Sequence, residues 1–284
     1  MVNVVYQENY SLESLRKITP SFWEGLSSSF FGVKVFIKPN LVVPVTKWEQ
    51  ASLTHINVVS LVIEELKDRG CSDIIVGDCG FKGQWDFTIH SSGYEKLPKK
   101  YGIQLIGLQE GENFHKFSLI RFPNKKDYLS LFGVRFSDYM LGSALIINIS
   151  KLKVHKMALV TGAIKNMMGT MTQKGSMHPR ANVHILHKRL RDLYFLIREK
   201  VKFCVMDGIV GSEYSEHYGI PKKVGVLISS TDMWETDCLA SCIMGINPSE
   251  VPYLKLIQQG KREDFPFTQT IRNFERPLGW RKKI

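Results

Sequence analysis

The stretch ALIINISKLKVHKMALVTGAIKNMMG, residues 144–169, decides the fold. Its first six residues, 144–149, are mostly apolar and rich in β-branched side chains, which predicts a short buried strand. A basic polar turn follows, with Lys151, Lys153, His155 and Lys156. Residues 158–168 then predict a helix that ends at Gly169. Ligands in open α/β sheets bind at such junctions, so we expect these lysines and the free N–H groups of the helix to face an anion.

Upstream of this stretch, residues 33–77 predict a strand, a helix and a second strand. VKVFIK (33–38) is the first strand, and Pro39 ends it because proline cannot donate a hydrogen bond to the ladder. Thr54 is the expected N-cap of a helix whose apolar residues recur at helical spacing up to Gly70. DIIVG (73–77) is the next strand. A strand–helix–strand unit of this length predicts that its two strands are parallel.

Other elements are predicted on both sides of the central stretch. Residues 102–108 predict a strand, and residues 114–136 alternate apolar and polar side chains like a hairpin near the edge of the sheet. Residues 185–201 predict a helix with arginines on one side. KFCVM (202–206) and residues 224–229 predict two more strands, the second followed by a helix that ends near Gly245.

Polar clusters follow five of the predicted strands. They are Lys38-Pro39-Asn40, Asp78-Cys79-Gly80, residues 151–155, Asp207-Gly208 and residues 230–232. If the strands are parallel, all five clusters lie at one edge of the sheet, which is the expected active-site face. The predicted fold class is α/β, with three layers: a mostly parallel sheet and helices on both of its faces. We expect a lead-in (1–31), a single α/β domain (32–250) and a basic C-terminal extension packed on that domain (251–284).

The charge of the chain points to an anionic partner. The 284 residues carry a net charge of +11, and residues 151–200 contain eleven Lys and Arg against Asp192 and Glu199. The partner of such a segment is a small anionic molecule, a nucleic acid or an acidic surface. Nucleic acid is less favoured because the segment has one aromatic pair, Tyr194-Phe195, and no interleaved aromatic residues.

Cysteine and histidine spacing gives no metal motif. Five cysteines (Cys71, Cys79, Cys204, Cys238 and Cys242) lack ligand spacing and are expected to be reduced thiols. His178, His184 and His187 match no closed zinc site, so metal ligands stay unassigned. The longest apolar runs are too short for a transmembrane segment, and the N-terminus lacks the pattern of a signal peptide. A cytoplasmic location is therefore expected.

Ordered motifs across residues 32–250 carry a family resemblance. They are KPN (38–40), GD (77–78), KLKVH (151–155), GAIKNMMG (162–169), DG (207–208), SSTD (229–232) and GINP (245–248). On these motifs the chain resembles the domain of unknown function 362 family. The resemblance implies an α/β architecture similar to that of lactate racemase, and with it carboxylate substrates and proton transfer by lysine or histidine. Many family members are associated with ferredoxin-like iron–sulfur segments, whose C-x-x-C-x-x-C run is absent from this chain.

The motifs and the strand ends together predict the site residues. The expected catalytic residues are His155, Lys153, Asp207 and Asp78, and the expected anion-binding residues are Lys38, Asn40, Lys151, Lys165, Asn166 and His178. His155 is either a core or loop histidine satisfied by a backbone carbonyl or a group for proton transfer, for which the unperturbed histidine pKa of about 6.5 is suitable. Lys165 and Asn166 either cap the end of a helix or contact the ligand. Asp232 is expected to cap a helix.

Three hypotheses of function follow. The leading one is an enzyme that acts on a small carboxylate or phosphate by lysine and histidine acid–base chemistry, in an isomerisation, epimerisation or group transfer. The second is a redox accessory protein that works with an iron–sulfur partner protein. The third is a binder of nucleic acid or of an acidic surface, through residues 151–200 and the C-terminal extension.

Overall fold

A computed structural model describes residues 2–45, 49–81, 83–108, 114–116, 128–142, 144–171, 182–261 and 274–277. Its main sheet has the strand order β1-β10-β9-β7-β2-β3-β4, and β8 pairs with β7. The strands are β1 (Val2–Tyr6), β2 (Lys34–Pro39), β3 (Asp73–Asp78), β4 (Gln104–Gly107), β7 (Leu145–His155), β8 (Leu159–Thr161), β9 (Val201–Glu213) and β10 (Ile220–Ser230). Strands β9, β7, β2, β3 and β4 are parallel to one another. The mostly parallel sheet is thus confirmed.

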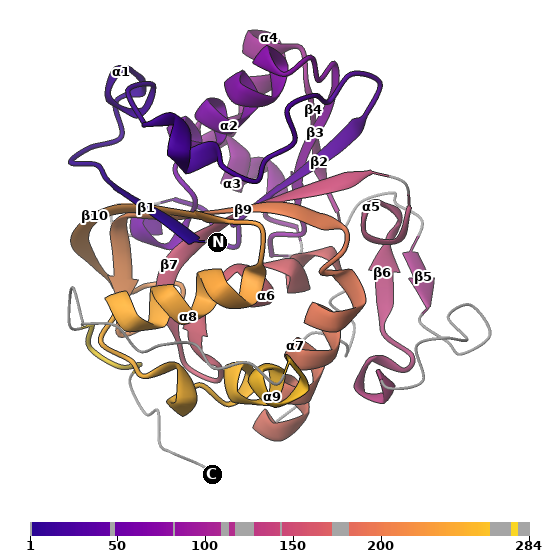
Figure 1. The fold of residues 1–284 in the computed structure, drawn as a ribbon, viewed down its shortest axis with the longest axis vertical. Helices are drawn as coiled ribbons and strands as arrows, with labels where there is room; N and C mark the ends of the chain where they lie inside the picture. Colours follow the sequence, from indigo (N-terminus) through magenta and orange to yellow (C-terminus); the bar gives the residue numbers. More distant parts are fainter. Residues whose placement is uncertain are drawn as a thin grey trace.

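Helices cover both faces of this sheet (Figure 1). One face carries α1 (Leu12–Leu15), α2 (Ile56–Asp68), α3 (Trp85–Ser92) and α4 (Leu97–Tyr101). The other face carries α6 (Ala163–Asn166), α7 (Val183–Ile197), α8 (Met233–Ile243) and α9 (Pro252–Lys261). Successive side chains of a strand point to opposite faces, so Val35 and Ile37 enter the first core while Phe36 enters the second. The structure therefore has the three layers that the sequence predicts.

The direction of β10 differs from the expectation. It pairs antiparallel with both β9 and β1, so the residues that follow it lie at the edge opposite to the carboxyl ends of the parallel strands. Only four of the five polar clusters consequently share one edge. Asp232 caps α8 at the opposite edge, as expected, and accepts hydrogen bonds from the backbone of Trp234 and Glu235.

The central stretch forms a longer strand than the one predicted. Strand β7 continues through Lys151, Lys153 and His155, which were expected in a turn, because β9 extends beside it and β8 pairs with its last residues. The predicted helix of residues 158–168 is instead β8, the single turn α6 and a 3-10 turn, Met167–Thr170. Gly169 lies inside that turn, where an added Cβ would come within 2.7 Å of Lys38 Cε. Glycine therefore lets the turn approach the end of β2.

Smaller differences affect the flanking elements. Residues 2–6 of the expected lead-in form β1 and pair with β10. Helix α2 has His55 as its N-cap, whereas Thr54 Oγ1 donates to the carbonyl of Ile149 and accepts from the backbone of Asn40. The expected hairpin of residues 114–136 corresponds to β5 (Phe114–Lys116) and β6 (Arg135–Ser137), which pair antiparallel in a separate sheet. A 3-10 turn, Leu129–Leu131, and helix α5 (Asp138–Leu141) flank β6.

The helices of the described ranges give no membrane-crossing candidate. None of them combines the length with the apolar composition that a transmembrane span requires.

Candidate functional site

A cavity of about 450 Å³ lies at the carboxyl ends of β2, β3 and β7. Its polar lining includes Lys38, Asn40, Asp78, Lys153, His155, Thr161, Lys165, Asn166, Glu216 and His217. Seven of these ten residues were expected in the site from the sequence. Three lysines face two carboxylates in this lining, so the cavity is suited to an anion.

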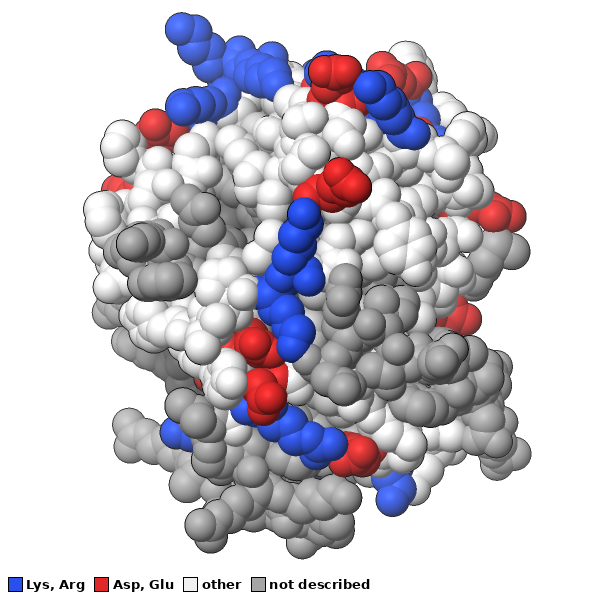
Figure 2. All heavy atoms as spheres, turned by 90° about the vertical axis from the view of Figure 1, so that its left-hand side faces the viewer, with Lys and Arg blue, Asp and Glu red and all other residues white. Residues whose placement is uncertain are grey.

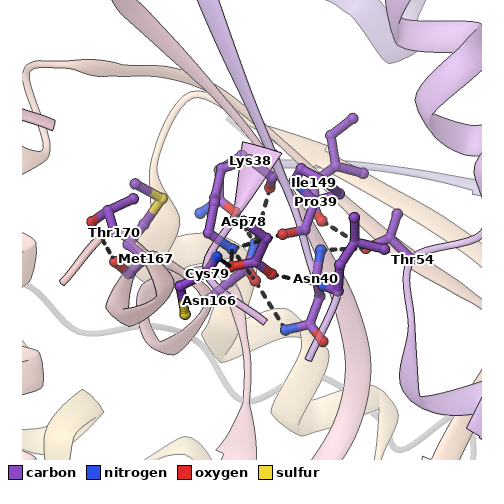
Figure 3. Close-up of polar contacts among 12 residues, drawn as sticks. Lys38, Pro39, Asn40, Thr54, Asp78, Cys79, Ile149, Asn166, Met167 and Thr170 are labelled. Carbon is purple, nitrogen blue, oxygen red and sulfur yellow. Dashed lines mark hydrogen bonds and ion pairs between the residues drawn. The ribbon is translucent and has the colours of Figure 1, made fainter. Parts of the chain in front are cut away.

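Lys38 and Asp78 form a buried ion pair at the base of the cavity (Figure 3). Lys38 Nζ lies 2.7 Å from Asp78 Oδ1 and also donates to the carbonyl of Pro39 and to Asn166 Oδ1. The Asp78 carboxylate accepts further hydrogen bonds from the backbone of Leu41 and Cys79. The pair thus fixes the two turns that follow β2 and β3, and all three donors of Lys38 are in use.

Asn166 joins three elements beneath the cavity. Its Oδ1 accepts from Asn40 Nδ2 at 2.9 Å and from Lys38 Nζ at 3.3 Å. Its Nδ2 donates to Asn148 Oδ1 at 2.8 Å and to the Lys38 carbonyl at 3.1 Å. Asn148 in turn donates to the carbonyl of Ala163. The side chain of Asn166 therefore ties α6 to β2 and β7.

Asn166→Ala is expected to lower the free energy of unfolding by about 2–4 kcal/mol, because it leaves buried groups of Asn40 and Asn148 without partners. Chemical denaturation measures the change. Asn182→Ala, which removes an exposed cap of α7, is the comparison, with an expected loss of about 1 kcal/mol. Equal losses in the two variants would contradict the role of Asn166.

Lys153 is a buried cation with three fixed acceptors. Its Nζ donates to Asn40 Oδ1, to the carbonyl of Ser52 and to the carbonyl of Glu216, at 2.8–3.0 Å. Burial, reinforced by the nearby charge of Lys165, lowers the pKa of Lys153 to about 7. The three surrounding oxygens favour the ammonium form, since only that form donates a hydrogen bond to each of them.

The backbone fixes the tautomer of His155. Its Nδ1 accepts from the backbone N–H groups of Met157 and Ala158, at 3.0 and 3.1 Å. The ring proton must then reside on Nε2, which lies 3.7 Å from Glu216 Oε1. His155 therefore acts as a hydrogen-bond donor at Nε2, and any gain of a proton at Nδ1 would break two hydrogen bonds.

Lys165 differs from the other two cavity lysines. It lies on α6 and lines the cavity, but its ammonium has no hydrogen-bond or ion-pair partner in the part of the chain that the structure describes. Burial lowers the pKa of Lys165 to about 8, opposed by the charge of Glu216. Among the described residues, Lys165 is therefore the cavity lysine whose ammonium has no acceptor from the protein.

Asp237 of α8 occupies the N-terminus of α6. Its carboxylate accepts hydrogen bonds from the backbone N–H groups of Ala163 and Ile164 and from the hydroxyl of Tyr253. An added Cβ at Gly162 would collide with this carboxylate. The free helix N–H groups that were expected to face an anion are thus already satisfied.

Lys151 and Asp207 form a second buried pair outside the cavity lining. Lys151 Nζ lies 2.8 Å from Asp207 Oδ2 and 2.9 Å from the hydroxyl of Tyr10, which donates to Asp207 Oδ1. The ring of Tyr10 stacks on His55 at 3.9 Å between centroids. Burial lowers the pKa of His55 to about 4. The pair holds the N-terminal segment against the ends of β7 and β9.

Several cavity residues were not singled out in the sequence. Glu216 and His217 lie in the loop between β9 and β10, and Thr161 ends β8. Thr161 Oγ1 and His217 Nδ1 are buried without a hydrogen-bond partner among the described residues. Asn148 carried a usable signal, since it is a polar residue within an apolar strand. No comparable sequence signal distinguishes the loop residues Glu216 and His217.

Some expectations concern a residue outside the described ranges or groups other than the cavity lining. His178 lies outside the described residues. Within the described ranges, no cluster of three or more His, Cys, Asp or Glu side chains is arranged to hold a metal ion. The five cysteines are buried, and none of them forms a disulfide.

Comparisons with known proteins agree with the fold. The model of the domain of unknown function 362 family matches residues 35–241. A thylakoid-associated protein of Synechocystis sp. is 24% identical over 226 residues, which cover 78% of this chain and 66% of that protein. The lactate racemase apoprotein of Thermoanaerobacterium thermosaccharolyticum is similar in structure, with a TM-score of 0.50 and 10% identity, over 86% of this chain and 57% of that one. The chain thus spans less than two thirds of either protein.

Proposed function

We propose that this chain, which belongs to the domain of unknown function 362 family, is an enzyme that binds a small anionic molecule in the cavity and acts on it by acid–base chemistry. The main support is the contrast between the cavity lysines. Lys38 and Lys153 each use three donors on fixed acceptors, whereas Lys165 has no partner among the described residues. A largely buried ammonium without a partner is costly, and an anion beside Lys165 would offset that cost.

The surrounding groups have complementary roles in this proposal. The anion lies against Lys165 Nζ, next to His155. Lys153 supplies a fixed positive charge, with Asp78, Asn40 and the Lys38 ammonium holding the framework. Because its pKa is about 8, Lys165 exchanges a proton with the substrate near neutral pH. An isomerisation or epimerisation fits these groups, since a proton taken from the substrate is returned to it, at another position or on the other face of the same carbon, and no oxidant is consumed.

Lys165→Met is expected to weaken the binding of lactate and of inorganic phosphate by about tenfold or more, because the charge-assisted hydrogen bond to the anion is lost. Isothermal titration calorimetry measures both affinities. Lys99→Met, at an exposed position of α4, is the matched control and should bind like the wild type. Unchanged affinity in the Lys165 variant, or no binding of either anion to the wild type, would overturn the proposed function.

Anion affinity is expected to fall as the pH rises through about 8. The ammonium of Lys165 is the binding form, and raising the pH removes its proton and its charge. A bound anion raises the pKa of Lys165, so the fall should move to higher pH at saturating ligand. Titrations between pH 6.5 and 9.5 test this, and a flat profile in the wild type would be inconsistent with the role of Lys165.

The fold comparison is compatible with this proposal. Lactate racemase, as its name states, acts on a small carboxylate, and its apoprotein shares the fold of this chain. The nucleic-acid alternative has less support. Figure 2 shows one face on which the basic side chains of the described residues lie in separate small groups next to acidic ones, including a short central column, rather than in a broad basic surface.

A further inference from the structure

The donors left in the cavity are suited to a single negative charge. Lys38 and Lys153 have no donor to spare, and Asp237 occupies the N-terminal amides of α6. The ammonium of Lys165 remains, together with the hydroxyl of Thr161 and Nδ1 of His217, which have no hydrogen-bond partner among the described residues. Phosphate sites commonly add guanidinium groups or free helix N-termini, and the described lining offers neither. This donor set fits a monocarboxylate.

Much of the remaining wall is apolar. Val42, Phe81, Met157 and Met168 line the cavity, and Cys79 lies beside them. Met168 is buried, whereas Phe81 is 37% exposed and stands at the boundary between the cavity and solvent. A three-carbon acid would leave most of this surface in contact with water, since a volume of about 450 Å³ lies within the range of pockets that hold much larger ligands.

Two loops meet across the end of the sheet at Phe81. This residue follows β3, and His217 follows β9, while β2 and β7 lie between those strands. Three strand spacings separate β3 from β9 by roughly 14 Å. The rings of Phe81 and His217 nevertheless lie 5.2 Å apart, edge to face. The two loops therefore bring an aromatic pair over the strand ends that carry the lysines.

Resting on the function proposed above, we infer that the substrate is a monocarboxylate with an apolar, preferably aromatic, body. Its carboxylate lies against Lys165 and Thr161, and its apolar body packs on Phe81, Met157 and Met168. Aromatic rings favour edge-to-face and offset contacts with one another, and methionine sulfur packs well on ring edges. Burial of a phenyl group on this wall adds affinity that a small hydroxy acid cannot obtain.

A matched pair of ligands tests the inference. The affinities of 3-phenyllactate and lactate, each as both enantiomers, are measured by isothermal titration calorimetry on the full chain. We expect 3-phenyllactate to bind about tenfold tighter or better. Phe81→Ala should lower the ratio of the two affinities about fivefold or more, and Phe87→Ala, an exposed aromatic position on α3, should leave the ratio unchanged. Phenyl phosphate in the same assay should bind more weakly than 3-phenyllactate.

The outcomes separate this inference from the function on which it rests. If lactate and 3-phenyllactate bind equally well and both depend on Lys165, the anion site is correct and the apolar-body inference is overturned. If neither ligand binds, both are overturned. A ratio that Phe81→Ala does not change, or a preference for phenyl phosphate, would also refute the inferred substrate class. Circular dichroism of each variant verifies that the fold is retained.

Discussion

Asp207→Ala is expected to lower the free energy of unfolding by about 3–5 kcal/mol, because it leaves the ammonium of Lys151 buried without a counter-charge. The carboxylate also accepts hydrogen bonds from the hydroxyl of Tyr10 and from the backbone of His55 and Ile209. Each of these donors would lose its acceptor in the variant. Urea denaturation followed by circular dichroism measures the loss.

A double variant distinguishes the missing charge partner from a general packing defect. Removing both charges, in Lys151→Met with Asp207→Leu, should recover part of the stability, since replacing a buried ion pair with apolar groups is often tolerated. The recovery is measured against the sum of the losses in the single variants Lys151→Met and Asp207→Leu. A loss below about 1 kcal/mol in Asp207→Ala, the value typical of an exposed pair, would show that the pair does not hold the N-terminal segment.

The layered fold could be predicted from the sequence because its signals are local. Strands β2 and β3 and helix α2 follow from apolar periodicity and from Pro39 and Gly70, and each lies within two residues of its expected position. The polar clusters after β2, β3 and β7 lead directly to Lys38, Asp78 and the lysines of the central stretch. The clusters and the motifs therefore contain most of the polar residues that line the cavity.

Pairing partners were harder to predict because they depend on distant segments. The length of β7 depends on its pairing with β9 and β8, and the sequence of residues 151–155 does not indicate either pairing. The antiparallel direction of β10 likewise arises from its pairing with β9 and β1. Glu216 and His217 reach the cavity only because the β9–β10 loop folds back over the sheet edge, and loop composition does not encode that path.

The distribution of hydrogen bonds could not be predicted either. The sequence predicts Lys38, Lys151 and Lys165 as anion ligands and Lys153 as a catalytic residue, and it indicates no difference in their hydrogen bonding. In the structure Lys165 has no acceptor among the described residues, whereas the other three lysines have acceptors from the protein. The expected roles of the individual lysines in catalysis and binding therefore remain proposals, and the variants above discriminate between them.

The strongest test of the cavity framework compares two aspartates on one strand. Asp78→Ala is expected to cost about 3–5 kcal/mol of unfolding free energy, because Lys38 becomes an uncompensated buried charge. Asp73, at the other end of β3, pairs with Lys34 at 3.4 Å between exposed side chains, so Asp73→Ala should cost only about 0–1 kcal/mol. Both pairs join β2 to β3, so burial is the main difference between them. Urea denaturation of the two variants gives the comparison, and similar losses would refute the assignment of Lys38 and Asp78 as the fixed base of the cavity.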